Sequence, residues 1–225
     1  PMLDAEQIVE YGQEAVKTGI SMAIHAIGDR ANHEVLNAYE QLRVFEGQIG
    51  APTLRHRIEH VQILHPDDYG RLASLNVIAS MQPIHATSDM FIADKHWGKR
   101  SAGAYALRTQ LERGARVAFG SDAPVESPNP FWGIHAAVTR TRHNGQPGPE
   151  GWYPEQRLSL QQALDGYTTG PAFAAGLERR LGQLAPGFYA DLIVFDSDPF
   201  DLAPAELYTV QPAATMVAGE WVWQS

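Results

Sequence analysis

The chain reads ISMAIH at residues 20–25 and turns at Gly28-Asp29. A short apolar run of this kind, with a glycine on each side, is typical of a buried strand. Before it, Asp4–Gln7 resembles a capping box that opens a run of apolar residues at helical spacing. After it, a second helix is predicted from about Arg30 to Phe45. The stretch therefore predicts a buried strand between two amphipathic helices.

The same alternation continues along the chain. Further apolar strands are predicted at Leu54–His60, Val77–Met81 and Arg116–Phe119. Pro66 suits the first turn of a helix that ends near Asn76, and a longer loop with another helix precedes the last strand. Strands that alternate with helices favour a parallel sheet or barrel. The uneven spacing of the strands excludes a short solenoid repeat.

The pattern changes from about Pro186 onwards. Ala190–Phe195 contains a continuous apolar strand, and Thr215–Trp223 is predicted to form a hairpin around Gly219. The stretch Asn144–Pro154, rich in glycine and proline, is interpreted as an excursion loop. We therefore expect an α/β domain over residues 1–185 and a small β-rich part over residues 186–225.

Composition narrows the classes of function. The 26 acidic and 17 basic residues give a net charge of −9, which disfavours binding to nucleic acid or anionic lipid. Because the chain has no cysteine, a metal site must use His, Asp and Glu. No apolar stretch approaches the roughly 18 residues of a membrane span. The chain starts at Pro1, so we expect an N-terminal part to be missing and leave targeting open, with a cytoplasmic location favoured.

Polar side chains follow the predicted strands where each one ends. His25 ends the first strand, Glu59-His60 the second, Gln82 follows the third and Asp122 the fourth. The carboxyl ends of parallel strands share one rim, and ligands bind there in α/β folds. Two imidazoles and a carboxylate suit a divalent cation such as zinc, manganese or iron. The pattern therefore suggests a metal site that activates water, although a single strand-end histidine is more often structural.

Five segments, taken in order, resemble a known family. IHAIGDRA at 24–31, RHRIEH at 55–60, QPIHATSDM at 82–90 and GSDAPVE at 120–126 are similar to the second half of amidohydrolase family 3, the branch of the YtcJ-like proteins and N-substituted formamide deformylase. GFYADLIV at 187–194 is similar to the return of that superfamily into its small β-sandwich. The resemblance covers nearly the whole chain.

The resemblance implies a fold and a set of roles. Residues 1–185 would hold strands five to eight of a TIM-like (β/α)8 barrel, and residues 186–225 would add strands to the β-sandwich. By the family pattern, His25 and His60 are metal ligands, and Asp122 is both a ligand and the general base. The implied cofactor is one or two divalent ions, with zinc preferred. The implied reaction is hydrolysis of carbon–nitrogen bonds in amides, formamides or cyclic amides, by metal-activated water.

The chain also departs from the family pattern. The His-x-His pair of the first barrel strand and the bridging carboxylate of strand four have no counterpart upstream of His25. The alternative hypothesis is therefore an inert half-barrel fragment, or a module that needs the missing N-terminal half as its partner. Four strand–helix units cannot close an eight-stranded barrel, so we expect self-association of the isolated chain. Phosphoester hydrolysis is disfavoured, because no cluster of basic residues lies beside the strand ends.

Three further residues are weaker candidates for binding the substrate. Gln82 and His85 lie just past the third strand, where they would contact a substrate carbonyl or order the loop. Arg140 lies on the following helix and would bind a substrate carboxylate or stay solvated.

Structural roles explain most of the remaining polar residues and the tryptophans. We interpret His56 as a packing residue below His60, or as one that supports a ligand, and Glu59 as a partner of Arg57 or of a neighbouring helix. Asp29 is interpreted as a helix cap. The loop tryptophans would line the pocket or pack the loops themselves, and these are Trp97, Trp132 and Trp152.

Overall fold

The computed structural model describes residues 3–225, which form two compact units. The first comprises the chain up to Met81 together with Phe91–Ala118, and the second comprises Gln82–Met90 and Phe119–Ser225. The expected boundary between residues 185 and 186 falls inside the second unit, so that division stays a prediction. No helix within residues 3–225 is long and apolar enough to span a bilayer.

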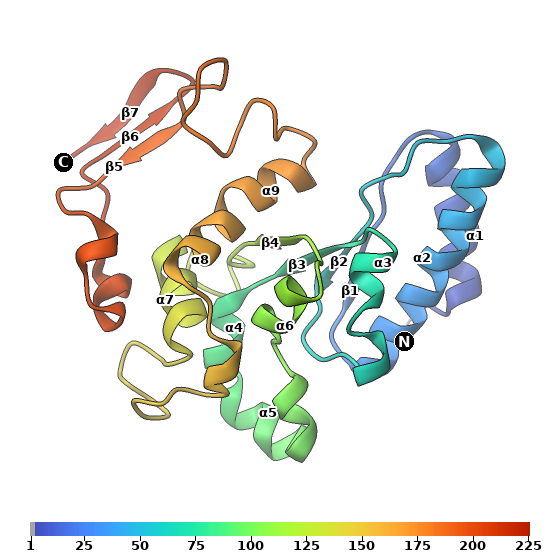
Figure 1. Cartoon of the computed structure of the whole chain (residues 1–225), viewed down its shortest axis with the longest axis horizontal. Coiled ribbons are helices and arrows are strands. Elements are labelled where there is room, and N and C mark those ends of the chain that lie inside the picture. Colours follow the sequence, from blue (N-terminus) through green and yellow to red (C-terminus); the bar gives the residue numbers. More distant parts are fainter. Residues whose placement is uncertain (1–2) are drawn as a thin grey trace. The chain divides into compact units, whose positions relative to one another are not determined.

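A four-stranded sheet follows the predicted order of strands (Figure 1). Its strands are β1 (Ala23–Ala26), β2 (Arg57–His60), β3 (Ile78–Met81) and β4 (Val117–Phe119), and they lie side by side in chain order. β1 pairs parallel with β2, and β2 with β3. The prediction of an α/β fold with a parallel sheet is confirmed, although the strands are shorter than the apolar runs suggested.

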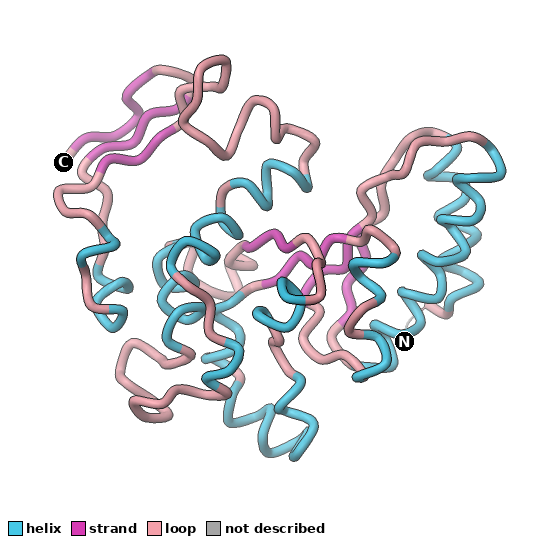
Figure 2. Tube along the Cα trace, viewed as in Figure 1, coloured by secondary structure: helices cyan, strands magenta, loops and turns pink. Residues whose placement is uncertain are grey.

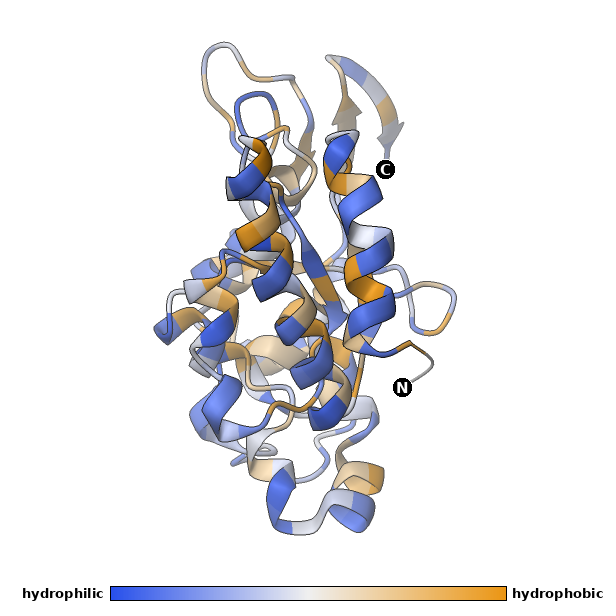
Figure 3. Cartoon of the chain, turned by 90° about the vertical axis from the view of Figure 1, so that its right-hand side faces the viewer, coloured by the Kyte–Doolittle hydropathy of each residue, from blue (hydrophilic) through white to orange (hydrophobic). Residues whose placement is uncertain are grey.

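Two long helices pack against each other in the first unit (Figure 1). Helix α1 (Ala5–Lys17) begins at Asp4 with the predicted capping box. Helix α2 (Asp29–Ile49) is longer than expected and ends at Gly50 in the left-handed conformation. Gly12 allows the close approach, since a Cβ there would lie 2.4 Å from Cδ1 of Leu42. Hydrophobic and hydrophilic stretches follow one another along the helices (Figure 3), as expected when apolar residues recur every three to four positions on one face.

The connections between the later strands differ from the prediction. The helix expected from Pro66 is broken into a 3-10 turn, Pro66–Asp68, and α3 (Arg71–Ser74). The loop expected after β3 holds two helices instead, α4 (Pro83–Ser88) in the second unit and α5 (Met90–Trp97). A 3-10 segment, Gly98–Gly103, and α6 (Leu107–Glu112) then lead to β4.

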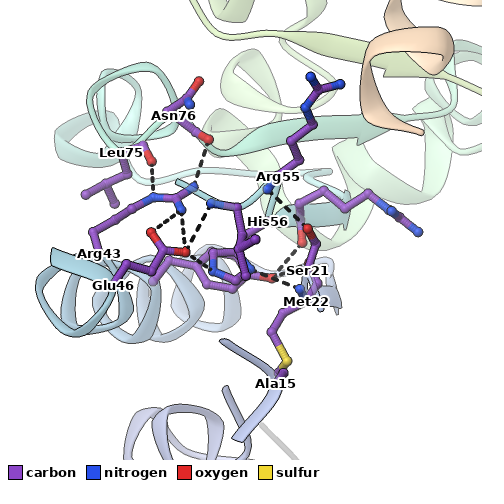
Figure 4. A network of polar contacts seen from close by, with 12 residues as sticks. Ala15, Ser21, Met22, Arg43, Glu46, Arg55, His56, Leu75 and Asn76 are labelled. Atoms are coloured by element: carbon purple, nitrogen blue, oxygen red, sulfur yellow. Dashed lines mark hydrogen bonds and ion pairs between the residues drawn. The ribbon is translucent and has the colours of Figure 1, made fainter. Parts of the chain in front are cut away.

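A buried polar network joins the start of β2 to helix α2 (Figure 4). Arg43 donates to both carboxylate oxygens of Glu46, at 3.0 and 2.7 Å, and to the backbone carbonyls of Leu75 and Asn76. His56 Nδ1 accepts the backbone N–H of Met22 at 2.9 Å, so its Nε2 carries the proton donated to Glu46 at 3.1 Å. The network ties the start of β1 to that of β2, and it confirms His56 as a packing residue.

The second unit combines helices with a three-stranded antiparallel sheet (Figure 2). Besides α4, its helices are α7 (Pro130–Thr139), α8 (Leu160–Tyr167) and α9 (Thr169–Ala174), with 3-10 segments at Pro154–Gln156, Pro199–Asp201 and Pro204–Thr209. The strands are β5 (Leu192–Val194), β6 (Ala214–Val217) and β7 (Glu220–Gln224). The predicted hairpin is confirmed, with Gly219 at a φ of 86° in its turn.

Candidate functional site

The imidazole rings of His25 and His60 meet at the carboxyl ends of β1 and β2. Their centroids lie 4.5 Å apart, and the rings cross at 71° in an edge-on arrangement. His25 is exposed and His60 is half-buried, so both rings can reach a ligand at this rim. The structure therefore brings together the two histidines that the sequence placed at neighbouring strand ends.

The backbone at His60 explains how its ring reaches His25. In the parallel register, His25 lies beside Glu59, and Ala26 lies beside His60. Regular alternation would therefore put the two histidine side chains on opposite faces of the sheet. His60 has a φ of 78°, a left-handed conformation that costs energy for a residue with a side chain. This break in the strand turns the imidazole towards His25, and strain of this kind is concentrated at functional sites.

Asp122 follows β4 with a similar backbone. Its φ is 60°, and its carbonyl accepts the N–H of Val125 in a tight turn. Aspartate tolerates the left-handed region better than most residues. The Asp122 carboxylate is about one-third exposed, and its Oδ2 lies 3.2 Å from Nε2 of His85. A carboxylate and an imidazole therefore form a second strand-end pair, here within the second unit.

Helix α4 holds His85 in place. Pro83 occupies the first turn of this helix, and Gln82 is its N-cap residue. The His85 side chain is buried, with Nε2 facing Asp122 and Nδ1 lying 3.8 Å from Oε1 of Glu126. His85 thus lies between two carboxylates. The sequence indicated His85 as a substrate contact. It did not single out the partner Glu126, which lies in the segment GSDAPVE.

A pocket of about 260 Å³ adjoins Glu126 in the second unit. Rings from three separate segments line it: Trp132 and His135 from α7, His143 just before the excursion loop, and Tyr208 from the 3-10 segment Pro204–Thr209. Ile84, Thr87 and Ser88 of α4 complete the wall together with Arg142. Of the three tryptophans considered from the sequence, Trp132 lines this pocket.

Burial changes the chemistry of one pocket imidazole. The His135 side chain is buried, and this burial, reinforced by the neighbouring His143, lowers its pKa to about 4. His135 is therefore neutral near pH 7. Its ring lies edge-on to that of Tyr208, with 5.4 Å between the centroids.

Arg140 differs from one expectation that the sequence raised, and its contact with a substrate stays a prediction. It is fully buried rather than solvated, and it ends α7 at a φ of 58°. Its Nε donates to the carbonyl of Trp152 at 2.9 Å, and its guanidinium lies over the Trp152 ring at 5.0 Å. These contacts hold the excursion loop against α7. The neighbouring Arg142, rather than Arg140, lines the pocket.

The other polar residues have structural contacts. Glu59 accepts from Nε of Arg57 at 2.5 Å, as expected. Asp29 is the first residue of α2 rather than its cap, and it pairs with Arg100. Trp97 ends α5 and packs near Tyr105, with 6.4 Å between ring centroids.

The side chains at the strand ends fit a divalent metal by their chemistry. His25 and His60 offer imidazole nitrogen, and Asp122 offers carboxylate oxygen, the donors that zinc, manganese and iron accept in hydrolytic sites. His85, which contacts the Asp122 carboxylate within the second unit, offers a further imidazole beside it.

Comparison with curated proteins gives long matches. The chain is 34% identical to the protein LONG AFTER FAR-RED 3 of Arabidopsis thaliana over 99% of its length, and 33% identical to the putative amidohydrolase YtcJ of Bacillus subtilis (strain 168) over 98%. It is 31% identical to the N-substituted formamide deformylase of Arthrobacter pascens over 95% of its length. These matches cover 37%, 41% and 38% of the relatives, so the chain spans about two fifths of their length.

A solved structure and a family model agree with these matches. An uncharacterized metal-dependent hydrolase from Pyrococcus horikoshii superposes with a TM-score of 0.77 at 29% identity, over 90% of this chain and 39% of the other. The model of the amidohydrolase family, Amidohydro_3, matches residues 1–223. The chain, with its parallel sheet and the strand-end residues His25, His60 and Asp122, therefore belongs to the amidohydrolase family.

Proposed function

We propose that the protein hydrolyses carbon–nitrogen bonds of non-peptide amides, formamides or cyclic amides with the help of a divalent metal, zinc being preferred. The observation that carries the proposal is the pair of left-handed residues, His60 and Asp122, at the ends of two strands of one parallel sheet. The family membership and the name of the formamide deformylase support this chemistry. The β1–β4 sheet would be strands five to eight of a (β/α)8 barrel, and β5–β7 would belong to the β-sandwich.

In this proposal His25, His60 and Asp122 hold the metal. A metal bound by such ligands polarises a carbonyl and lowers the pKa of its water. Asp122 takes the proton of the attacking water at a carboxylate oxygen and delivers it to the leaving nitrogen. His85 positions the Asp122 carboxylate by the contact at 3.2 Å. The substrate in this proposal is a small amide-type molecule.

The test measures metal content and amide hydrolysis in the protein at its full natural length. We expect His60→Ala to lose metal and activity together, and Asp122→Asn to lose turnover. His65→Ala is the matched control, because His65 is exposed and its side chain lies 3.5 Å from the carboxylate of Asp67. Full metal occupancy and activity in His60→Ala would show that the ligand assignment is wrong. Unchanged turnover in Asp122→Asn would remove its role as the base.

A second candidate is that these 225 residues alone are inactive. The match to only about two fifths of each relative favours it, because the relatives contain the remaining sequence. Large apolar side chains are also exposed on the second unit, among them Leu184 at 74% and Val125 at 70%. We expect the isolated chain to self-associate and to lack turnover. A monodisperse monomer by light scattering, or full activity of the chain alone, contradicts this candidate.

A further inference from the structure

The pocket beside Glu126 has an aromatic wall. The rings of Trp132 and His143 are stacked at 29° with 6.1 Å between centroids. His143 in turn lies 5.9 Å from Tyr208, and Tyr208 lies 5.4 Å from His135. Four rings, from α7, from His143 and from the 3-10 segment Pro204–Thr209, thus follow one another along one wall. Such a surface offers edge-on and stacked contacts to a further ring.

The size of the pocket limits what it holds. Its volume is about 260 Å³. An apolar cavity of about 150 Å³ is enough to bind benzene. The pocket therefore holds one six-membered ring together with the short polar group that the ring carries.

The charges around the pocket favour a neutral ligand. Arg142 lies in the wall, but its Nε and Nη2 donate to the carbonyls of Thr87 and Ser88, at 2.9 and 2.8 Å. Glu126 brings a carboxylate to the same pocket. The opposite charges of Arg142 and Glu126 offset each other, so the pair as a whole favours neither a cation nor an anion. His135 is neutral near pH 7 and adds no charge of its own.

Glu126 also links the pocket to the proposed reaction. Its Oε1 lies 3.8 Å from Nδ1 of His85, whose Nε2 contacts the Asp122 carboxylate. A ring bound in the pocket would therefore lie on the side of His85 where Glu126 is found.

We propose that this pocket binds a single neutral aromatic ring of the substrate, and that Trp132 and Tyr208 set the preference for a planar group. The inference rests on the proposed function, because it names the substituent of the amide that the site hydrolyses. Substrates of this class are amides that carry one monocyclic aromatic group. A puckered ring of equal carbon count fills the same space but cannot make the ring–ring contacts.

The test is calorimetric binding of benzamide and cyclohexanecarboxamide to the full-length, metal-loaded protein. The two probes share the carboxamide and differ in planarity. We expect tighter binding of benzamide. Trp132→Leu and Tyr208→Leu should each weaken benzamide about 2- to 10-fold while cyclohexanecarboxamide changes little, in line with the energy of aromatic pairs. Tyr208→Phe keeps the ring and should retain the preference.

Trp221→Leu is the control, since Trp221 lies on β7 outside the pocket. Equal affinity for both probes in the unmodified protein overturns the inference, as does unchanged benzamide binding in both leucine variants. His60→Ala separates the two proposals. If His60→Ala loses turnover but still prefers benzamide, both proposals are supported. If His60→Ala retains turnover, the metal-site assignment is wrong, and the benzamide preference tests the pocket inference by itself.

Discussion

His25 and His60 face each other across two neighbouring strands, with 4.5 Å between ring centroids, although the register pairs His25 with Glu59. The left-handed backbone at His60 makes this contact possible. Asp122, which follows β4, has the same left-handed backbone conformation. Backbone strain of this kind is concentrated at functional sites, which is why we propose this rim as the site.

His85 should matter for reaction rate or metal affinity through its contact with Asp122. We expect His85→Ala to reduce turnover or metal affinity about 10- to 100-fold, because the Asp122 carboxylate loses a contact that orients it. His85→Gln, which retains a polar group near Asp122, should recover part of the loss. Steady-state kinetics and metal titration check this, with His96→Ala on exposed α5 as the control. Equal rates in His85→Ala and the unmodified protein would contradict the role.

The buried ion pair between Arg43 and Glu46 should be important for stability. Glu46→Ala removes the acceptor of Arg43 Nη1 and of the proton on His56 Nε2, at a cost of roughly 3–5 kcal/mol in the free energy of unfolding. Glu14→Ala removes an exposed pair with Lys17 and should cost no more than about 0.5 kcal/mol. Urea unfolding of both variants gives the comparison. Similar midpoints for the two would show that the network contributes little.

Stability should fall as the pH drops from about 7 towards 4. Burial, together with the charge of Arg43, lowers the pKa of His56 from 6.5 to about 4, against the opposing effect of Glu46. The unfolded chain takes up this proton near pH 6.5. Between these values the unfolded state binds more protons, so acid favours unfolding, by on the order of 3 kcal/mol for one such histidine. His135 acts in the same direction.

Variants with His56→Gln and His135→Gln test the pH dependence. Each should show a shallower loss of stability between pH 7 and pH 4 in urea melts, since one titrating group is gone. His65→Gln, at an exposed position, should keep the slope of the unmodified protein. Identical slopes in all four proteins would mean that other groups control the acid response.

Two helical glycines should respond oppositely to alanine. Gly12→Ala places a Cβ within 2.4 Å of Leu42 Cδ1, so we expect a loss of about 1–3 kcal/mol from overpacking between α1 and α2. Gly47→Ala meets nothing within 4 Å and should gain about 0.5–1 kcal/mol from the lower backbone entropy of the unfolded chain. Thermal melts measure both. A stabilising Gly12→Ala would show that α1 shifts freely on α2.

Local signals determined the elements of the fold. The capping box at Asp4, the apolar run before His25 and the turn at Gly219 each depend on neighbouring residues, and the structure confirms them. The sheet order also followed from strands that alternate with helices. Together with the segments that resemble the amidohydrolase family, these signals identified the family and named His25, His60 and Asp122 as candidates. Their roles as ligands stay a prediction.

Only the tertiary structure decided which side chains meet. The approach of His85 to Asp122 joins residues far apart in sequence, and helix α4, which delivers His85, was expected to be a loop. The burial of Arg140 depends on Trp152 folding back over it, and Tyr208 reaches the pocket from a distant 3-10 segment. Contacts of this kind depend on packing between segments, whereas helix caps, strand runs and turns depend on the local backbone. That is why sequence predicted the elements and the tertiary structure assembled the pocket.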